Sequence, residues 1–315
     1  MSLSAAPAPV APNRTLAAAA AVLGYAVIIG FTDNYVRLIA EDAGLWQFHF
    51  VRTAMVLALA GLLAGPLALV WRPRNLRAVA GRSALHGVAL MIYFGCLAFL
   101  PVAQVAAGLF TAPIFVLLIT RFVYGHKLGP ARIAAAGIGF FGVVLVLSPA
   151  LEGGIGGVEV PGAVMVLPVV AGAFYAMGNI ATREWCMGES AVTLTLGFFV
   201  ALGLAGALGL VVLALAPQPV PGGAAGFVLR GWVRPDGGFL FWTAVQAVGS
   251  VVGVGLMVRG YQMAEASRVA IFEYVILPVS ALWSWVIWGD RIGPVAIAGM
   301  VLIFAAGAMI ARRGR

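Results

Sequence analysis

A few ionisable and hydrogen-bonding side chains stand inside long apolar stretches of this sequence, where polar groups are otherwise rare. Glu273 is the clearest case, because no cation lies one turn away on its own segment and Arg268 is its nearest basic residue in sequence. A carboxyl group in such a setting can carry a proton or bind a cationic amine. The alternative is a protonated glutamic acid that only forms a hydrogen bond between two helices.

His49 and Arg52 are three positions apart, so they share one face if their segment is helical. Asp33 lies at a similar depth in the preceding apolar stretch and could pair with Arg52. Such a group could bind a substrate carboxylate, or open and close a gate. It could equally be a fixed ion pair that ties two helices together and never meets a substrate.

Aromatic and amide side chains complete the set of candidates. A phenol in lipid needs a hydrogen-bond partner, which a wet cavity supplies, although packing is the commoner reason for a buried tyrosine. The residues predicted to bind or gate a substrate are Asp33, Asn34, His49, Arg52, Tyr93, Gln104, Tyr175, Asn179, Gln246, Tyr261 and Glu273. No metal site is expected, because the 3 histidines lie on separate segments. No cofactor is expected either, and the phosphate-binding glycine loop of ATP-driven proteins does not occur.

The elements that must position these residues are membrane helices. Hydrophobic residues make up 63% of the 315 residues and charged residues 10%, with a mean hydropathy of +1.05, whereas soluble domains are about one quarter charged. Lipid requires every backbone amide to bond internally, and long continuous apolar runs favour helices over a β-barrel. The composition therefore predicts an all-α polytopic membrane protein without a soluble, nucleic-acid-binding face.

Hydropathy predicts ten transmembrane spans. They lie near residues 16–39, 45–70, 83–100, 103–123, 130–148, 161–182, 190–216, 239–259, 266–288 and 294–311. Residues 1–13, rich in Ala and Pro, are expected to form a disordered tail. A cleaved signal peptide is disfavoured, because the first span ends at Asp33 and Asn34 and not at a small-residue cleavage site.

Basic residues predict the orientation. If the N-terminus is inside, 14 of the 19 basic residues fall in inner segments. We therefore interpret the net charge of +8 as a signal of membrane topology. These residues are Arg14, Arg72, Arg74, Arg77, Arg82, Arg121, Lys127, Arg132, Arg183, Arg259, Arg268, Arg312, Arg313 and Arg315. Both termini are therefore expected in the cytoplasm. Cys96 falls in a span and Cys186 in an inner loop, so the two cysteines suggest no disulfide.

A six-residue cassette occurs twice, at 125–130 and 289–294, which is an offset of 164 residues. Each copy leaves one apolar run and enters another, so the chain divides into two five-helix repeats over 14–149 and 150–315. An odd number of spans per repeat forces the second copy to insert upside down. Pro113 and Pro278 stand at nearly equivalent positions, and they are predicted to bend two helices that line a cavity from both sides.

These features resemble the drug/metabolite transporter superfamily, and specifically its EamA-like ten-helix members. The resemblance spans residues 14 to 312 and is carried by 50–54, 106–113, the first cassette, 179–183, 270–278 and 288–294. The family usually has Gly-Glu in the cassette, whereas His126 and Asp290 fill the acidic place here. The outer stretch 217–238 is also longer than such loops usually are. The resemblance implies a secondary carrier of small metabolites.

The combined expectation is a carrier in the inner membrane of a bacterium, present as a monomer or homodimer and acting by alternating access. Without ATP motifs, the driving force is the gradient of the small-molecule substrate or of a coupled ion, with a proton as the first expectation. An exporter of amino acids or related amphipathic compounds is the leading interpretation, because Arg52 suits a carboxylate and Glu273 an amine. The alternatives are an uptake carrier for a nucleoside-like or cofactor-like metabolite, an intramembrane lipid-modifying enzyme, and a passive channel.

Overall fold

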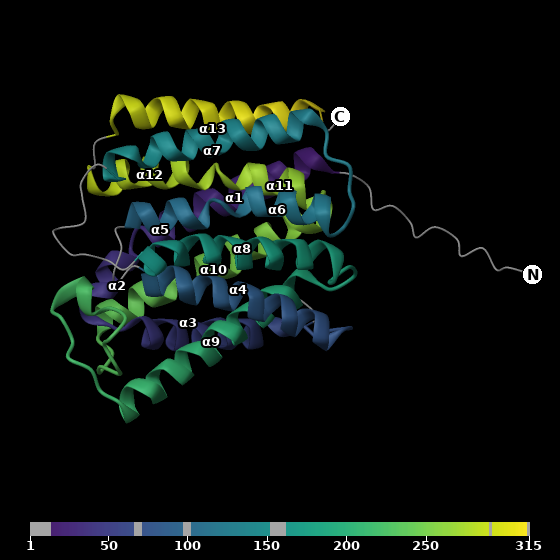
Figure 1. Ribbon diagram of the computed structural model, residues 1–315. Helices are drawn as coiled ribbons and strands as arrows, with labels where there is room; N and C mark the ends of the chain where they lie inside the picture. Colours follow the sequence, from purple (N-terminus) through teal and green to yellow (C-terminus); the bar gives the residue numbers. More distant parts are fainter. Residues whose placement is uncertain (1–13, 66–70, 97–101, 152–161, 290–291, 314–315) are drawn as a thin grey trace, which may run out of the picture.

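The structure is a computed structural model that describes residues 14–65, 71–96, 102–151, 162–289 and 292–313. The predicted tail at 1–13 and the cassette residues Asp290 and Arg291 lie outside the described residues. All regular elements within the described residues are helices (Figure 1).

The helices of the first half are α1 (Thr15–Asp33), α2 (Val36–Asp42), α3 (Leu45–Ala64), α4 (Leu76–Cys96), α5 (Val102–Leu109), α6 (Ala112–Phe122) and α7 (Pro130–Leu151). Those of the second half are α8 (Gly162–Glu184), α9 (Ala191–Leu215), the 3-10 helix η1 (Gly223–Gly226), α10 (Gly237–Met263), α11 (Ala266–Glu273), α12 (Ile276–Trp288) and α13 (Pro294–Arg313). Among the residues that the structure describes, seven helical stretches are long and apolar enough to cross a membrane, and α6 and α7 add shorter apolar segments. The prediction of an all-α polytopic membrane protein is confirmed.

Three predicted spans are interrupted helices. α5 ends at Leu109 and α11 at Glu273, while α6 begins at Ala112 and α12 at Ile276, so both breaks recur at the 164-residue offset. Pro113 and Pro278 each lie in the first turn of the helix that follows the break. Backbone N–H groups in the first turn have no partner within the helix, so a proline, which lacks this N–H, loses no hydrogen bond there. The interruption of α1 and α2 at Asn34 and Tyr35 is the third.

Local signals explain where several helices begin and end. The Ser190 side chain accepts a hydrogen bond from Thr193 N at the start of α9, and Asp236 does the same from Phe239 N at the start of α10. Gly125 and Gly289, the first residues of the two cassettes, have φ of 67° and 73°. This left-handed conformation suits glycine, and it turns the chain at the end of each fourth span.

The two halves are inverted relative to each other. Gly142 of α7 packs against Gly299 and Ile303 of α13, and Gly139 lies near Ala306, so these equivalent helices run antiparallel. α3 and α9 are antiparallel in the same way, with Trp46 against Gly209 and Thr53 against Gly203 (Figure 1). Small residues allow this close approach.

The two halves also interleave. α4, α5, α6 and α8 pack together in one bundle, and α1, α10, α11 and α12 pack together in another. The pair α7–α13 lies along one edge of the molecule and the pair α3–α9 along the other (Figure 1). Each bundle therefore contains helices from both halves, and the seam between the bundles runs through the centre of the protein.

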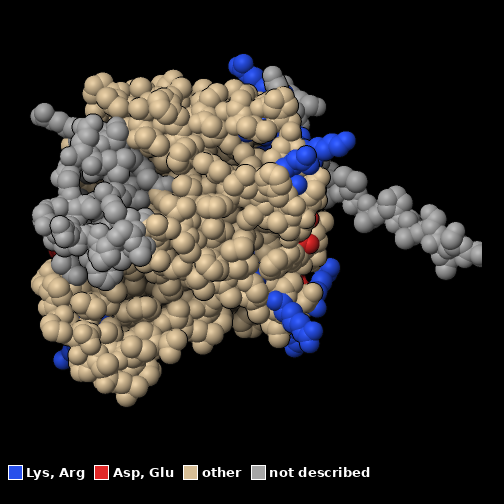
Figure 2. Space-filling model, viewed as in Figure 1, with Lys and Arg blue, Asp and Glu red and all other residues tan. Residues whose placement is uncertain are grey.

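The surface divides into an apolar belt and two ends. α1 begins and α13 ends at the same end of the molecule, which we call the terminal end. Figure 2 shows Lys and Arg side chains gathered at this end and an almost uncharged belt beside it. Exposed side chains such as Leu204, Leu208 and Phe304 belong to helices of that belt.

The long loop between α9 and α10 packs against the opposite end. Arg230 donates hydrogen bonds to the carbonyls of Ala40 and Ala43, at 3.0 and 2.9 Å. The side-chain amide of Gln47 bonds both the N–H and the carbonyl of Val233. Arg230 thus fastens the loop to the end of α2 through backbone carbonyls, and the Gln47 side chain fastens it to α3.

One predicted boundary was wrong. α4 begins at Leu76 and not near 83, so Arg82 lies inside the helix and not in an inner loop. Arg82 is buried and donates to Thr182 Oγ1 at 2.9 Å and to the Leu194 carbonyl at 2.8 Å. Because α8 and α9 supply these acceptors, the Arg82 guanidinium can be buried inside a helix, although hydropathy alone assigns this position to a loop.

Candidate functional site

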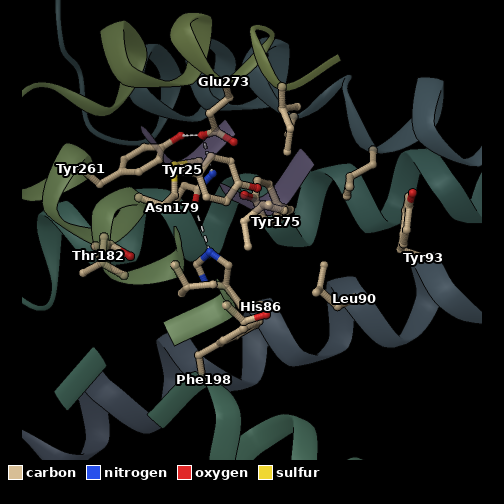
Figure 3. A pocket seen from close by; sticks show the side chains of 18 of the residues that line it. Tyr25, His86, Leu90, Tyr93, Tyr175, Asn179, Thr182, Phe198, Tyr261 and Glu273 are labelled. Carbon is tan, nitrogen blue, oxygen red and sulfur yellow. Dashed lines mark hydrogen bonds between the residues drawn. The ribbon is translucent and has the colours of Figure 1, made fainter. Parts of the chain in front are cut away.

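A cavity of about 170 Å³ lies in the seam between the two bundles. Pro113, at the break between α5 and α6, belongs to its lining. The polar residues that line it are Tyr25, Asp33, Arg52, Arg82, His86, Tyr93, Tyr175, Asn179, Thr182, Ser250, Tyr261 and Glu273. Figure 3 shows part of this lining. Pockets for drug-sized ligands usually measure about 300–1,000 Å³, so this cavity must widen to hold a metabolite of that size.

A hydrogen-bonded network closes the cavity toward the terminal end. Asn179 of α8 donates from Nδ2 to Glu273 Oε1 at 3.0 Å, and the Tyr261 hydroxyl donates to the same oxygen. His86 Nε2 lies 2.9 Å from Asn179 Oδ1, which requires the imidazole proton on Nε2 in this arrangement (Figure 3). The network therefore links α4 and α8 of one bundle to α10 and α11 of the other.

A second network lies toward the opposite end of the cavity. Gln246 donates from Nε2 to Asp33 Oδ1 at 3.0 Å, and its Oε1 lies 3.5 Å from Arg52 Nη1. Arg52 Nη2 donates to His49 Nδ1 at 3.0 Å. The carboxamide of Gln246 thus stands between the acid and the base, and the Asp33–Arg52 salt bridge weighed from the sequence does not form.

Both networks place a carboxamide between a carboxyl group and a basic residue, but they differ in exposure. Asp33 is exposed in the cavity, whereas Glu273 is only 6% exposed. The terminal end of the cavity is therefore sealed more completely than the Asp33 end.

Aromatic rings form much of the remaining wall. Tyr175 meets the His86 ring edge-on at 5.3 Å, and Tyr93 meets Phe94 at 5.3 Å. Tyr25 and Phe198 also line the cavity (Figure 3). Rings of this kind can stack on a flat substrate while phenol hydroxyls bind its polar edge.

The structure brings most of the predicted site residues to this seam. Seven of them line the cavity, and they are Asp33, Arg52, Tyr93, Tyr175, Asn179, Tyr261 and Glu273. His49 and Gln246 lie behind the wall and hold Arg52 and Asp33. Asn34 bonds the backbone carbonyls of Gly30 and Ser280 at the break after α1. The side chain of Gln104, on α5, lies outside what the structure describes.

Two central residues were not predicted as part of the site. His86 was not among the predicted site residues and Arg82 was assigned to an inner segment, yet both are buried and line the cavity. Their four-residue spacing on one helix face was the available signal, and the misplaced start of α4 hid it.

These features define a helical membrane protein of two inverted halves with a polar and aromatic cavity at the seam. Residues 16–148 match the EamA-like transporter family. A riboflavin transporter of Rhizobium johnstonii is 26% identical over 275 residues, which cover 87% of this chain and 81% of that protein. A pseudopaline exporter of Pseudomonas aeruginosa is 21% identical over 287 residues, which cover 89% and 92%.

A solved crystal structure has the same fold, with a TM-score of 0.72 and 19% identity over 96% of this chain and 99% of that one. Residues 16–148 are thus an EamA-like transporter domain, as the resemblance predicted, and the similarity to named transporters extends over most of the chain. The protein is a multi-pass bacterial membrane protein.

Proposed function

We propose that this protein is a secondary or facilitative carrier that moves a small amphipathic metabolite across the membrane by alternating access. The observation that carries the proposal is the cavity between two bundles, each built from both inverted halves. Separation of the bundles at one end, and then at the other, would expose the cavity to each side in turn. The arginine-rich terminal end supports a cytoplasmic location for both termini.

The cavity chemistry favours a substrate with a flat ring and a polar edge, such as the nucleoside-like or cofactor-like metabolite considered from the sequence. Tyr25, Tyr93 and Tyr175 offer rings and hydroxyls, and the similarity to a riboflavin transporter supports the same class. Glu273 is occupied by Tyr261 and Asn179, which leaves it a weaker candidate for holding a substrate amine in the state described.

Export of an amino acid or related compound is the second candidate. Arg52 lines the cavity, so its guanidinium group could bind a substrate carboxylate. The similarity to an exporter supports this direction of transport.

Counterflow in proteoliposomes tests the proposal. Vesicles loaded with an unlabelled compound are diluted into its labelled form, with riboflavin, nucleosides and amino acids as separate probes. A carrier accumulates the label transiently by exchange, whereas a channel or an enzyme does not. No transient accumulation of any probe, despite folded protein in the vesicles, would contradict the proposal.

Matched variants distinguish the two substrate classes. Tyr175→Phe keeps the ring and Tyr175→Leu removes it, so only the leucine variant should lose most affinity for a flat substrate, because a stacked ring contributes about 1 kcal/mol, or roughly fivefold. Arg52→Met should abolish transport only if the substrate is a carboxylate bound by Arg52. Equal effects of both tyrosine variants would contradict the stacking role.

A further inference from the structure

The corner between α8 and α9, residues 185–190, holds the start of α4 at the terminal end of the molecule. The Glu189 side chain is buried, and its carboxylate accepts hydrogen bonds from the backbone N–H groups of Arg74 and Asn75, at 3.1 and 2.7 Å. These two residues directly precede α4, where the positive end of the helix dipole also favours an anion. The carboxylate therefore fixes the corner to α4.

Further side chains join α4 to α8 and α9 deeper in the protein. Arg82 of α4 donates to Thr182 of α8 and to the Leu194 carbonyl of α9, and His86 of α4 bonds Asn179 of α8. Arg82 and Glu189 bring charged groups to these contacts, and both side chains are buried. Loss of a partner would leave a buried charge unsatisfied, which is costly. We call these three helices and their corner the α4–α8–α9 body.

A second set of hydrogen bonds crosses the seam from this body to α10. Arg183 Nη1, at the end of α8, donates to the backbone carbonyl of Gln262 at 2.6 Å. In return, Gln262 Nε2 donates to the backbone carbonyl of Glu189 at 2.8 Å. Gln262 lies next to the last residue of α10, so the two bonds run in opposite directions between the same two chain segments. We call Arg183, Gln262 and Glu189 the latch.

The latch forms an outer layer of the closed terminal end. Asn179 and Arg183 are four residues apart on α8 and therefore share one face of that helix. Asn179 binds Glu273 at the wall of the cavity, and Arg183 binds Gln262 one turn closer to the terminal end. Arg183 and Gln262 are only half-buried, so water can reach them. The cavity is thus separated from the terminal surface by two successive layers of hydrogen bonds.

The bonds of the latch are easier to exchange for water than the bonds inside the α4–α8–α9 body. Arg183 and the Gln262 amide both donate to neutral backbone carbonyls at a partly wet surface, and water can replace such acceptors at low cost. Elsewhere on the seam, α6 and α11 meet through apolar side chains, including Val116 and Val269 of one cluster. When the two bundles separate at this end, Glu189 should therefore stay with α4, and its contact with Gln262 should break.

We propose that the latch holds the terminal end of the cavity closed, and that this end opens when the α4–α8–α9 body moves as one rigid unit away from Gln262. This inference rests on the proposed carrier function. Weakening the latch should favour a state that is open at the terminal end, without loosening the body itself.

Distances between pairs of spin labels test this movement without any substrate. One pair, at Met187→Cys and Arg259→Cys, spans the latch, and a second pair, at Met187→Cys and Arg77→Cys, lies within the body; all three native side chains are exposed. With the native cysteines replaced by alanine, Arg183→Met should add a longer distance to the first pair, with the ratio of open to closed molecules about tenfold higher. The second pair should not change. Unchanged distances in the first pair, or lengthening of both, would overturn the proposal.

Two matched variants control for charge. Arg183→Lys keeps one donor for the Gln262 carbonyl, so it should restore the distances toward those of the wild type. Arg312→Met removes the same charge from an exposed position on α13 at the same end, and it should leave the distances unchanged. If R312M acted like R183M, the movement would follow net charge and the latch would be refuted.

Cys186 is a native reporter of the same seam. It is fully buried against Val79, Leu194 and Val258 of α10, so separation of the latch exposes it. In a Cys96→Ala background at fixed pH, R183M should raise the rate at which a maleimide labels Cys186 about tenfold, and Gln262→Met about fivefold. Labelling rates equal to that of the parent would also overturn the proposal.

The latch and the carrier function can fail separately. Wild-type counterflow together with unchanged spin-label distances in R183M would refute the latch alone. The expected change in distance without any wild-type counterflow would refute the carrier function alone, because the spin-label and labelling measurements need no substrate.

Discussion

Gly178 of α8 offers a direct test of the network at the terminal end, through the substitution Gly178→Ala. A Cβ at this position would lie 2.2 Å from His86 Nδ1 and 2.4 Å from Cε1. Ordinary contacts between non-bonded atoms are about 3.5–4.0 Å, so the imidazole must move by roughly 1 Å or more. His86 is 5% exposed and has little free space, and the shift breaks its 2.9 Å bond to Asn179.

Three effects set the size of the change. Overpacking costs about 1–3 kcal/mol, and loss of the hydrogen bond adds about 1 kcal/mol. Alanine favours a helix interior over glycine by up to about 1 kcal/mol, which offsets part of the loss. The net expectation is a destabilisation of about 1–3 kcal/mol, or roughly 2–6 °C in apparent melting temperature.

Thermal unfolding in detergent at a fixed scan rate measures this change. Gly137→Ala on α7 is the matched control, because a Cβ there meets no heavy atom within 4 Å, and it should leave the melting temperature unchanged or higher. In ¹⁵N spectra of histidine-labelled protein, only the His86 signals should move strongly in G178A. Equal melting temperatures for G178A and G137A would refute the packing around His86.

Three further predictions concern other parts of the fold. Gly299→Ala should lower the free energy of unfolding by about 1–3 kcal/mol relative to G137A. Its Cβ would lie 2.5 Å from the Gly142 carbonyl oxygen and 2.8 Å from Val146 N, and these backbone atoms cannot rotate away. Unchanged stability would contradict the close α7–α13 contact. Arg230→Met should speed proteolysis of the α9–α10 loop about fivefold or more, because three backbone carbonyls lose their donor. An unchanged cleavage rate would show that other contacts hold the loop. Burial raises the pKa of the Cys186 thiol to about 11. In a Cys96→Ala background, the rate at which a maleimide labels Cys186 should therefore be slow at mildly alkaline pH and rise about tenfold per pH unit as the pH approaches this pKa. A labelling rate that does not depend on pH would contradict a buried thiol.

The class of fold was predictable because it depends on properties that a sequence displays directly. Apolar runs identify the spans, and the repeated cassette identifies the two halves. Pro113 and Pro278, predicted as points where two helices bend, mark where the two helices are interrupted, and both interruptions recur at the 164-residue offset. Inversion follows from the odd number of spans alone.

The hydrogen bonds that connect the residues of the site were less predictable from the sequence. Arg82 looks like a loop residue until Thr182 and the Leu194 carbonyl, on α8 and α9, are brought beside it. A direct pair between Asp33 and Arg52 was one of the alternatives considered from the sequence, but Gln246 of α10 lies between them. Such bridges depend on contacts between residues far apart in the chain, and neither hydropathy nor helical spacing encodes them.

The antiparallel pairs α3–α9 and α7–α13 have a consequence for how such a protein could arise. Each pair joins equivalent helices from the two halves, so each half binds an upside-down version of itself. A gene for one five-helix unit, with balanced charges at its two ends, could insert in both orientations and assemble the same seam as a dimer. Duplication and fusion would then free each copy to specialise, and only one copy here carries a glutamate beside the break in its fourth span.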